Sequence, residues 1–231
     1  MAKHRSKRYK KAAELVDTEK VYPIAEAVAL VKTLPAPKFD QTVTLTFRMG
    51  VDPRQSDQMV RGTCPLPNGS GKDVRVLVFA EGEAAAEAKS AGAEHVGLVE
   101  LIKEVQDGMN DFDAVVATPS AMSEVRKLGR QLGPRGLMPN PKTGTVTDDT
   151  AAAVKAVKAG RIDFKLDKNG NISVPIGKAS FEDAALIENG HAVIDSINNA
   201  RPATAKGIFI ENGALAATML PGLKIDVSAW N

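Results

Sequence analysis

Short apolar runs and amphipathic stretches alternate along the middle of the chain. The first run, Asp73–Ala80, predicts a buried strand, and the Ala- and Glu-rich stretch after it predicts a helix that ends near Ala91. Further strands are predicted at 95–98 and 112–117, and further helices at 100–106, at 120–128 with Ser120 as its N-cap, and at 148–159. Strands that alternate with helices favour right-handed βαβ units around a parallel sheet. The middle of the chain is therefore predicted to be a Rossmann-like α/β domain.

The two flanks have a different pattern, in which strands and helices form separate runs. The N-terminal flank predicts an amphipathic helix over Tyr22–Thr33 and an alternating strand over Lys38–Val51. The C-terminal flank predicts strands at 160–166 and 172–176 joined as a hairpin by the turn 167–171, then a helix at 181–199 and strands at 206–211 and 215–227. Separate runs of this kind indicate an α+β domain with one antiparallel sheet.

The simplest assembly inserts one domain into the other. We expect residues 1–66 and 160–231 to form a discontinuous α+β domain whose antiparallel sheet takes strands from both termini. Residues 67–159 are expected to form the inserted Rossmann-like parallel α/β domain. The run Pro65–Gly71 and the residue Gly160 mark the two crossings between the domains. Two adjacent crossings predict a hinge.

The segment Gly133–Val146, called the Pro/Gly segment below, has the most unusual composition in the chain. It holds three prolines and three glycines in fourteen residues, with two cations and no acid. Because proline fixes φ and glycine permits positive φ, the segment is predicted to be a rigid, non-repetitive loop rather than a helix or a strand. Composition alone is also compatible with a stiff surface linker.

Charge is segregated along the chain, although the net charge is only +2. Met1–Lys11 carries six cations and Val125–Thr147 carries five, and neither segment contains an acid. Glu81–Asp113, in contrast, holds nine acids and two lysines. Such segregation lets a nearly neutral protein bind a polyanion with one face. Solvated helix faces explain the acidic run well, but they explain the two acid-free basic runs less well.

The chain lacks the residue patterns of common enzyme and cofactor sites. The one cysteine, Cys64, can form neither an internal disulfide nor a zinc cluster, and the three histidines lie far apart without ligand spacing. The residues that follow the first predicted strand, Ala80–Ala84, are acidic where a dinucleotide pyrophosphate would bind, and Gly69–Lys72 matches only the tail of a P-loop. We therefore expect no catalytic residue, no metal and no cofactor. A nucleotide- or metabolite-binding enzyme built on the α/β insert is the less favoured alternative.

The overall composition is that of a globular protein, with 43% apolar and 25% charged residues. Aromatic residues make up only 4% of the chain, which argues against stacking on many single-stranded bases. No apolar run approaches the roughly 18 residues of a membrane span, and the basic N-terminus lacks the apolar run of a secretory signal. A cytoplasmic protein without a membrane partner is the expectation.

Several long segments resemble, in the right order, the bacterial large-subunit ribosomal protein L1 family. The Pro/Gly segment resembles the signature of that family, and Asp111–Pro119 is a near-identical match. Ala36–Val43 is similar to the family pattern A-K-F-D-E-T-V, and Gly50–Gly62 is similar to G-I-D-P-R-x-S-D-Q-N-V-R-G. Shorter matches occur at Arg8-Tyr9, Gly160–Phe164 and Ile176–Phe181. The resemblance covers nearly the whole chain.

The resemblance implies a structural protein of the large ribosomal subunit that binds large-subunit rRNA directly. It also implies that the protein forms the mobile side stalk near the tRNA exit site, assists release of deacylated tRNA and represses translation of its own operon mRNA. The implied partners are large-subunit rRNA, the leader of that mRNA, exit-site tRNA and the rest of the subunit. The protein is expected to be a monomer off the ribosome and to be located on cytoplasmic ribosomes. The roles of rRNA binder and mRNA repressor share one site and do not exclude each other.

The RNA contacts that the resemblance implies fall mainly on the two-part domain. Carried over to matching positions, they are Lys38, Phe39, Thr42, Arg54, Lys165, Lys168, Thr218 and Met219. Lysines suit phosphates, threonine hydroxyls can donate to and accept from ribose 2′-hydroxyls, and Phe39 and Met219 can pack on sugar or base faces. Core packing is equally open for Phe39, since it is in phase with Val43. In the insert, the candidates for contact with tRNA or rRNA are Arg130, Arg135 and Lys142.

One position departs from the family pattern Thr-Met-Gly-Pro, because this chain has Thr218-Met219-Leu220-Pro221. Glycine would let the backbone approach RNA closely, whereas Leu220 adds bulk and restricts φ. Two explanations are open. Either the segment lies slightly further from the RNA, or Leu220 packs against the RNA.

Overall fold

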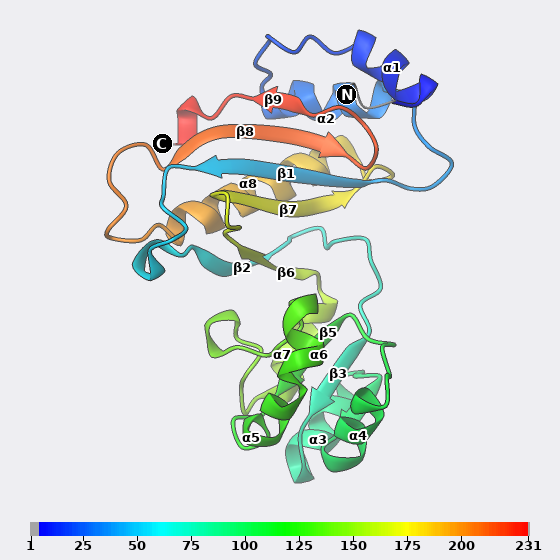
Figure 1. Ribbon diagram of the computed structural model, residues 1–231. Coiled ribbons are helices and arrows are strands. Elements are labelled where there is room, and N and C mark those ends of the chain that lie inside the picture. Colours follow the sequence, from blue (N-terminus) through cyan, green and yellow to red (C-terminus); the bar gives the residue numbers. More distant parts are fainter. Residues whose placement is uncertain (1–4, 231) are drawn as a thin grey trace. The chain divides into compact units, whose positions relative to one another are not determined.

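The computed structural model describes residues 5–230, and the chain forms two compact units (Figure 1). One unit consists of Met1–Gly71 together with Ile162–Asn231, and the other consists of Lys72–Arg161. The predicted fold class is confirmed. The first unit has an antiparallel sheet with strands from both ends of the chain, and the second has a parallel sheet.

The four-stranded sheet of the first unit runs in the order β7-β1-β8-β9. Its strands are β1 (Thr42–Met49), β7 (Asn171–Lys178), β8 (Ile210–Ala217) and β9 (Leu223–Ile225). Because side chains alternate along a strand, Val43, Leu45 and Phe47 of β1 all point into one core and are almost completely buried. The helices α2 (Ile24–Thr33) and α8 (Asp183–Asn199) bury their apolar sides in the same core.

The other face of this sheet, called the outer face below, carries mostly small and polar side chains. Along β1 the residues of this face run from Thr42 to Arg48, and Thr46 lies opposite Ser173 of β7 and Ala214 of β8. The hydroxyl oxygens of Thr46 and Ser173 are 3.1 Å apart. Small side chains allow another molecule to approach the backbone of the sheet closely.

The strands predicted at 206–211 and 215–227 are wrong in position. The chain instead forms β8 over Ile210–Ala217, although Asn212-Gly213 is a strong turn signal in the sequence. Packing overrides that signal, because a Cβ atom at Gly213 would lie 2.7 Å from Cγ1 of Ile225. Glycine is therefore the residue that lets β9 pack closely on this strand.

The predicted hairpin of 160–166 with 172–176 is also wrong. The strand β6 (Arg161–Lys165) pairs with β2 (Arg61–Pro65) in a separate two-stranded sheet. The intervening turn does form, since the Asp167 amide donates to the Asn171 carbonyl at 2.8 Å. After that turn the chain leaves β6 and pairs with β1 from Arg48 back to Thr42. This pairing satisfies more buried backbone groups than a short hairpin would.

The second unit is an α/β sandwich around a sheet of order β4-β3-β5. Its elements are β3 (Val76–Phe79), α3 (Gly82–Ser90), β4 (His95–Gly97), α4 (Val99–Gln106), β5 (Ala114–Ala117), α5 (Met122–Val125), α6 (Gly129–Arg135) and α7 (Thr150–Lys158). Leu77 and Phe79 pack with residues of α4 and α6, whereas Val76 and Val78 pack with residues of α3 and α7. Helices thus cover both sides of β3, as a parallel sheet requires.

Two helix predictions in this unit are wrong. Ser120 does not cap the helix after β5, because α5 begins at Met122 and the Ser120 hydroxyl lies 3.0 Å from that of Thr118. The start of the Pro/Gly segment is helical rather than a loop, because α6 continues through Pro134. Pro134 lies in the last turn of this helix, which ends at Arg135 and is followed by Gly136 in the left-handed conformation, with φ of 72°.

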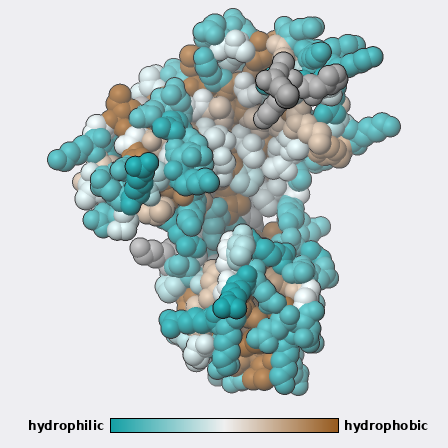
Figure 2. Space-filling view, viewed as in Figure 1, coloured by the Kyte–Doolittle hydropathy of each residue, from teal (hydrophilic) through white to brown (hydrophobic). Residues whose placement is uncertain are grey.

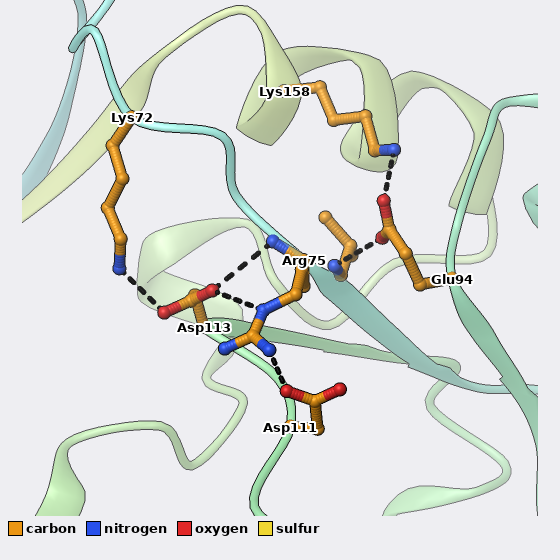
Figure 3. A network of polar contacts seen from close by, with 7 residues as sticks. Lys72, Arg75, Glu94, Asp111, Asp113 and Lys158 are labelled. Atoms are coloured by element: carbon orange, nitrogen blue, oxygen red, sulfur yellow. Dashed lines mark hydrogen bonds and ion pairs between the residues drawn. The ribbon is translucent and has the colours of Figure 1, made fainter.

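Ion pairs join the strand ends of the second unit (Figure 3). Asp113, just before β5, accepts hydrogen bonds from Lys72 Nζ at 2.6 Å and from Arg75 Nε at 3.0 Å. Arg75 also pairs with Asp111. The Lys72 ammonium, together with the Arg75 guanidinium, lowers the pKa of Asp113 to about 2. The contacts fix the start of this unit, at Lys72, to the start of β5.

Candidate nucleic-acid interface

The turn that connects β8 to β9 has an unusual backbone. The Leu220 amide donates to the Ala217 carbonyl at 3.0 Å, which closes a tight turn around Thr218 and Met219. Met219 has a φ of 65°, and among the described residues it is the one non-glycine with positive φ. A side chain in this conformation crowds its own backbone, and such strain persists only where surrounding contacts enforce it. The Met219 side chain is 61% exposed.

Contacts with the start of β1 enforce this turn. The Thr218 hydroxyl donates to the Thr42 carbonyl at 3.2 Å and accepts from the Thr42 amide at 3.3 Å. The buried amide of Gln41 donates to the Thr218 carbonyl at 2.6 Å. Because the Thr218 hydroxyl proton already has a protein acceptor, the free capacity of this exposed oxygen is to accept a further hydrogen bond.

Cations and an exposed ring lie around the start of β1, which contacts the turn. Lys178 Nζ donates to the Thr42 hydroxyl at 3.1 Å, and Lys38 is exposed just before β1. Phe39 is 47% exposed, so the core-packing alternative for this residue is wrong. The strand starts at Thr42 rather than at Lys38, and before it the Asp40 carboxylate accepts from the Ser180 amide and hydroxyl. The turn surface is defined here by Lys38, Phe39, Thr42, Lys178, Thr218 and Met219.

The N-terminal helix α1 (Lys7–Glu14) adds a further cation to the turn surface. Its N-cap Ser6 accepts a hydrogen bond from the Tyr9 amide, and Ala12 is completely buried against the first unit. The Arg8 Nη2 atom lies 3.5 Å from the Met219 sulfur, and Arg8 Nε is buried without a hydrogen-bond partner. The sequence showed the charge of this segment but not its helix or its packing. Lys3, which the charge count included, lies outside the described residues.

The remaining candidates of the first unit lie at the opposite end of β1. The turn that contains Lys168 contacts this end, because Arg48 Nη1 donates to the Asn169 carbonyl at 2.7 Å and the Met49 amide donates to Gly170. Arg54 follows in the loop after β1, and Lys165 is exposed on β6. Eight strand residues separate the two ends, a span of roughly 25 Å. The structure therefore brings the candidates together as two groups rather than one.

A groove of about 670 Å³ lies on the outer face near this second group. Arg48, Asn171, Asn212 and Lys224 contribute polar side chains, and Ala214 forms part of the apolar lining. None of these four polar residues was predicted from the sequence. They meet through the register of β7, β8 and β9, which local sequence patterns do not reveal.

Leu220 points away from the exposed turn. It is only 8% exposed and belongs to the apolar core of the first unit. The side chain is therefore packed in the protein, so packing of Leu220 on RNA is wrong, whereas greater distance of the segment from RNA stays a prediction. Its backbone does not need glycine either, because Met219 and not Leu220 takes the left-handed conformation.

The Pro/Gly segment is held by contacts within the second unit. Arg135 Nη1 donates to the Asn110 side chain at 2.6 Å, and its guanidinium lies 5.4 Å from the centre of the Phe112 ring. The buried Thr145 hydroxyl accepts from the Asn140 amide at 2.8 Å and lies 3.0 Å from the Thr143 hydroxyl. Of the candidate cations, Arg130 is exposed on α6, and the Lys142 side chain lies outside the described part of the structure.

The surface offers cations, amides and hydroxyls rather than a large apolar area. On the face shown in Figure 2, apolar side chains form small separate patches between hydrophilic ones. Within residues 5–230, no helix has the length and apolar run of a bilayer span. The same residues contain no cluster of three or more His, Cys, Asp or Glu side chains that could hold a metal ion.

A family model described as the ribosomal protein L1p/L10e family matches residues 30–221. The match covers most of the chain. It begins within α2, includes the whole second unit and ends just after the β8–β9 turn.

Proposed function

The chain belongs to the ribosomal protein L1p/L10e family, and on this premise we propose that it forms the mobile side stalk of the large ribosomal subunit near the tRNA exit site. Membership makes the chain a non-enzymatic ribosomal protein that binds large-subunit rRNA. The proposal concerns which part of the molecule binds this RNA and what the bound protein then does.

We assign the rRNA contact to residues 1–66 and 160–231, with the turn surface as its centre. The observation that carries this assignment is the strained Met219, held at φ of 65° beside the exposed Thr218 hydroxyl, with Arg8 at its sulfur and Lys178 bonded to the neighbouring Thr42. Exposed side chains kept in a strained conformation are more common at functional sites than elsewhere. Lysines suit phosphates, and a hydroxyl that can accept a hydrogen bond suits a ribose 2′-hydroxyl.

Residues 67–159 are proposed to act as the distal part of the stalk. Arg130, exposed on α6, is the side chain with which this part would contact exit-site tRNA and assist its release. Arg135 is already bonded to Asn110, so it would act through a second face of its guanidinium. The protein is expected to work on cytoplasmic ribosomes and to be a monomer when it is free.

A second role, repression of its own operon mRNA, is proposed for the same surface. Contacts to phosphates and 2′-hydroxyls recognise the shape of a folded RNA more than its sequence. An mRNA leader with the same fold as the rRNA site would therefore occupy the turn surface in its place.

The test is a titration of the whole protein with the stalk rRNA fragment and with the mRNA leader. Four to eight neutralised phosphates would give a log–log salt slope of roughly −3 to −7. Each RNA should displace the other, whereas a duplex of equal length should displace neither. A slope near zero would contradict the electrostatic contact, and simultaneous binding of both RNAs would contradict the shared site.

A further inference from the structure

Gln41 is a buried polar side chain whose position points to a role in RNA binding. It is 3% exposed, and its Nε2 atom donates to the Thr218 carbonyl at 2.6 Å. Gln41 is itself fixed, because its carbonyl accepts from the Ala179 amide at 2.8 Å. The side chain thus forms a rigid link from the start of β1 to the β8–β9 turn.

The turn needs such a link because its own backbone disfavours the conformation it has. Met219 is left-handed, and L side chains rarely adopt that region. The exposed half of the turn gains little from burial. The Leu220 side chain anchors its far end in the core, and the Gln41 amide holds the carbonyl immediately before Met219. The peptide between Thr218 and Met219 is therefore held from one side by a hydrogen bond and from the other by packing.

We propose that Gln41 is a positioning residue for RNA binding, which keeps the Thr218–Met219 peptide in the orientation that presents the Thr218 hydroxyl and the Met219 thioether. The inference rests on the proposed function, because it assumes that this turn contacts RNA. Gln41 acts through the turn and does not touch the RNA itself, since it is buried. Preorganisation of this kind raises affinity without adding a contact.

The chemistry at position 41 is specific. An amide can donate to the Thr218 carbonyl, whereas an ionised carboxylate has only acceptors and would repel that carbonyl. Gln41 and the buried Leu220 thus hold the same turn from its two ends.

The test compares two variants of the whole protein in a titration with the stalk rRNA fragment. Gln41→Glu replaces the donor by a charged acceptor, and Gln41→Met removes the donor at similar length without adding charge. If only about a tenth of the molecules of either variant keep the turn in its binding-competent conformation, the apparent RNA affinity falls about tenfold. Asn189→Asp is the matched control, because Asn189 is a completely buried amide of the same unit that bonds to Gly69 and Ile176. Affinity per folded molecule should not change in this control.

A coupling measurement separates positioning from general destabilisation. In a Thr218→Val/Met219→Ala background, Gln41→Met should have no further effect on RNA affinity, because the groups it positions are gone. An additive loss would overturn the inference, and so would wild-type affinity of Gln41→Met in the otherwise native chain. If Thr218→Val/Met219→Ala itself bound RNA normally, the proposed RNA site would fail instead.

Discussion

The Pro/Gly segment is recognisable from the sequence, whereas the unusual feature of the turn surface is visible only in the structure. The Pro/Gly segment is conspicuous in the sequence, yet its buried hydroxyls bond to each other and Arg135 bonds to Asn110 within the same unit. The β8–β9 turn is inconspicuous in the sequence, yet it holds a methionine at φ of 65° with an exposed side chain. Proline and glycine accommodate an unusual path without strain, whereas a methionine on such a path is strained. The proline and glycine content of the Pro/Gly segment therefore indicates a rigid backbone. The strain at Met219 indicates a functional site more strongly.

Removing one unit at a time should give the largest change in affinity for the stalk rRNA. A chain that joins residues 1–66 directly to 160–231 should bind the stalk rRNA nearly as well as the whole protein. Residues 67–159 alone should bind it about 10³-fold more weakly, which is the gap between specific and non-specific binding. Filter binding at one fixed salt concentration measures both. Equal or tighter binding by 67–159 would reverse the comparison and move the site to the Pro/Gly segment.

The next largest effect is the loss of stability expected when the Leu220 side chain is shortened. Leu220→Ala should lower the free energy of unfolding of the first unit by about 2–4 kcal/mol, because it leaves a cavity in a packed core. Chemical denaturation monitored by the fluorescence of Trp230, which contacts Phe47 in the same core, measures this change. An exposed leucine that contacts only RNA would give almost no change in stability and a loss of affinity alone.

Sequence patterns predicted the elements with strong periodicity. The helices α2, α7 and α8 occur close to where apolar spacing predicted them, and the Asp149 carboxylate accepts the Ala152 amide as the N-cap of α7. The patterns failed at β8, where the close approach of β9 to Gly213 decides the structure. Those contacts join residues far apart in the chain, and a local pattern has no information about them.

The candidate site was predictable only in part, for the same reason. Thr218 and Met219 came from a family resemblance. Gln41, Lys178 and Arg8 were missed as site residues, because strand pairing and the packing of α1 bring them to the turn. The signal that could have singled out Gln41 is its place as a polar residue within a predicted strand, but only the structure shows its partner.

A matched pair of threonines compares the two regions directly. Thr218→Val should weaken RNA binding by about five- to a hundredfold, because a lost hydroxyl contact that leaves its partner unpaired costs roughly 1–3 kcal/mol. Thr145→Val in the Pro/Gly segment removes a buried hydroxyl that accepts from the Asn140 amide. It should lower the stability of the second unit by about 1–3 kcal/mol and leave RNA affinity unchanged. If Thr145→Val weakened RNA binding and Thr218→Val did not, the hydroxyl of the Pro/Gly segment would be the one that binds RNA.

Acid should destabilise the second unit through Asp113. The pKa of Asp113 is lowered from 3.8 to about 2, chiefly by the Lys72 ammonium. A carboxylate with a lowered pKa contributes stability above its ordinary value, and this stability is lost as pH falls from about 4 towards 2. Asp113→Asn should remove about 1 kcal/mol at neutral pH, since its partners are partly exposed. Hydrogen exchange at β5 as a function of pH measures the effect, and a variant with the same acid sensitivity as wild type would exclude this pair as its source.

The smallest effects come from exchanging the left-handed residues of the two regions. Gly136→Ala should destabilise the second unit by about 1 kcal/mol, because an alanine would be strained at φ of 72°, although its Cβ would meet no atom within 4 Å. Met219→Gly should do the reverse, since it relieves strain at φ of 65° and leaves stability equal or higher by up to about 1 kcal/mol. Thermal unfolding measures both changes.

RNA affinity should nevertheless fall in Met219→Gly, because the thioether is lost and the turn becomes free to leave its left-handed form. Higher stability combined with weaker binding is the result expected when strain serves function, because a residue kept only for the fold would not destabilise it. Lower stability would mean that the side chain is kept for packing, in spite of its exposure. Wild-type affinity in this variant would mean that the backbone of the turn, and not the Met219 side chain, is what the RNA recognises.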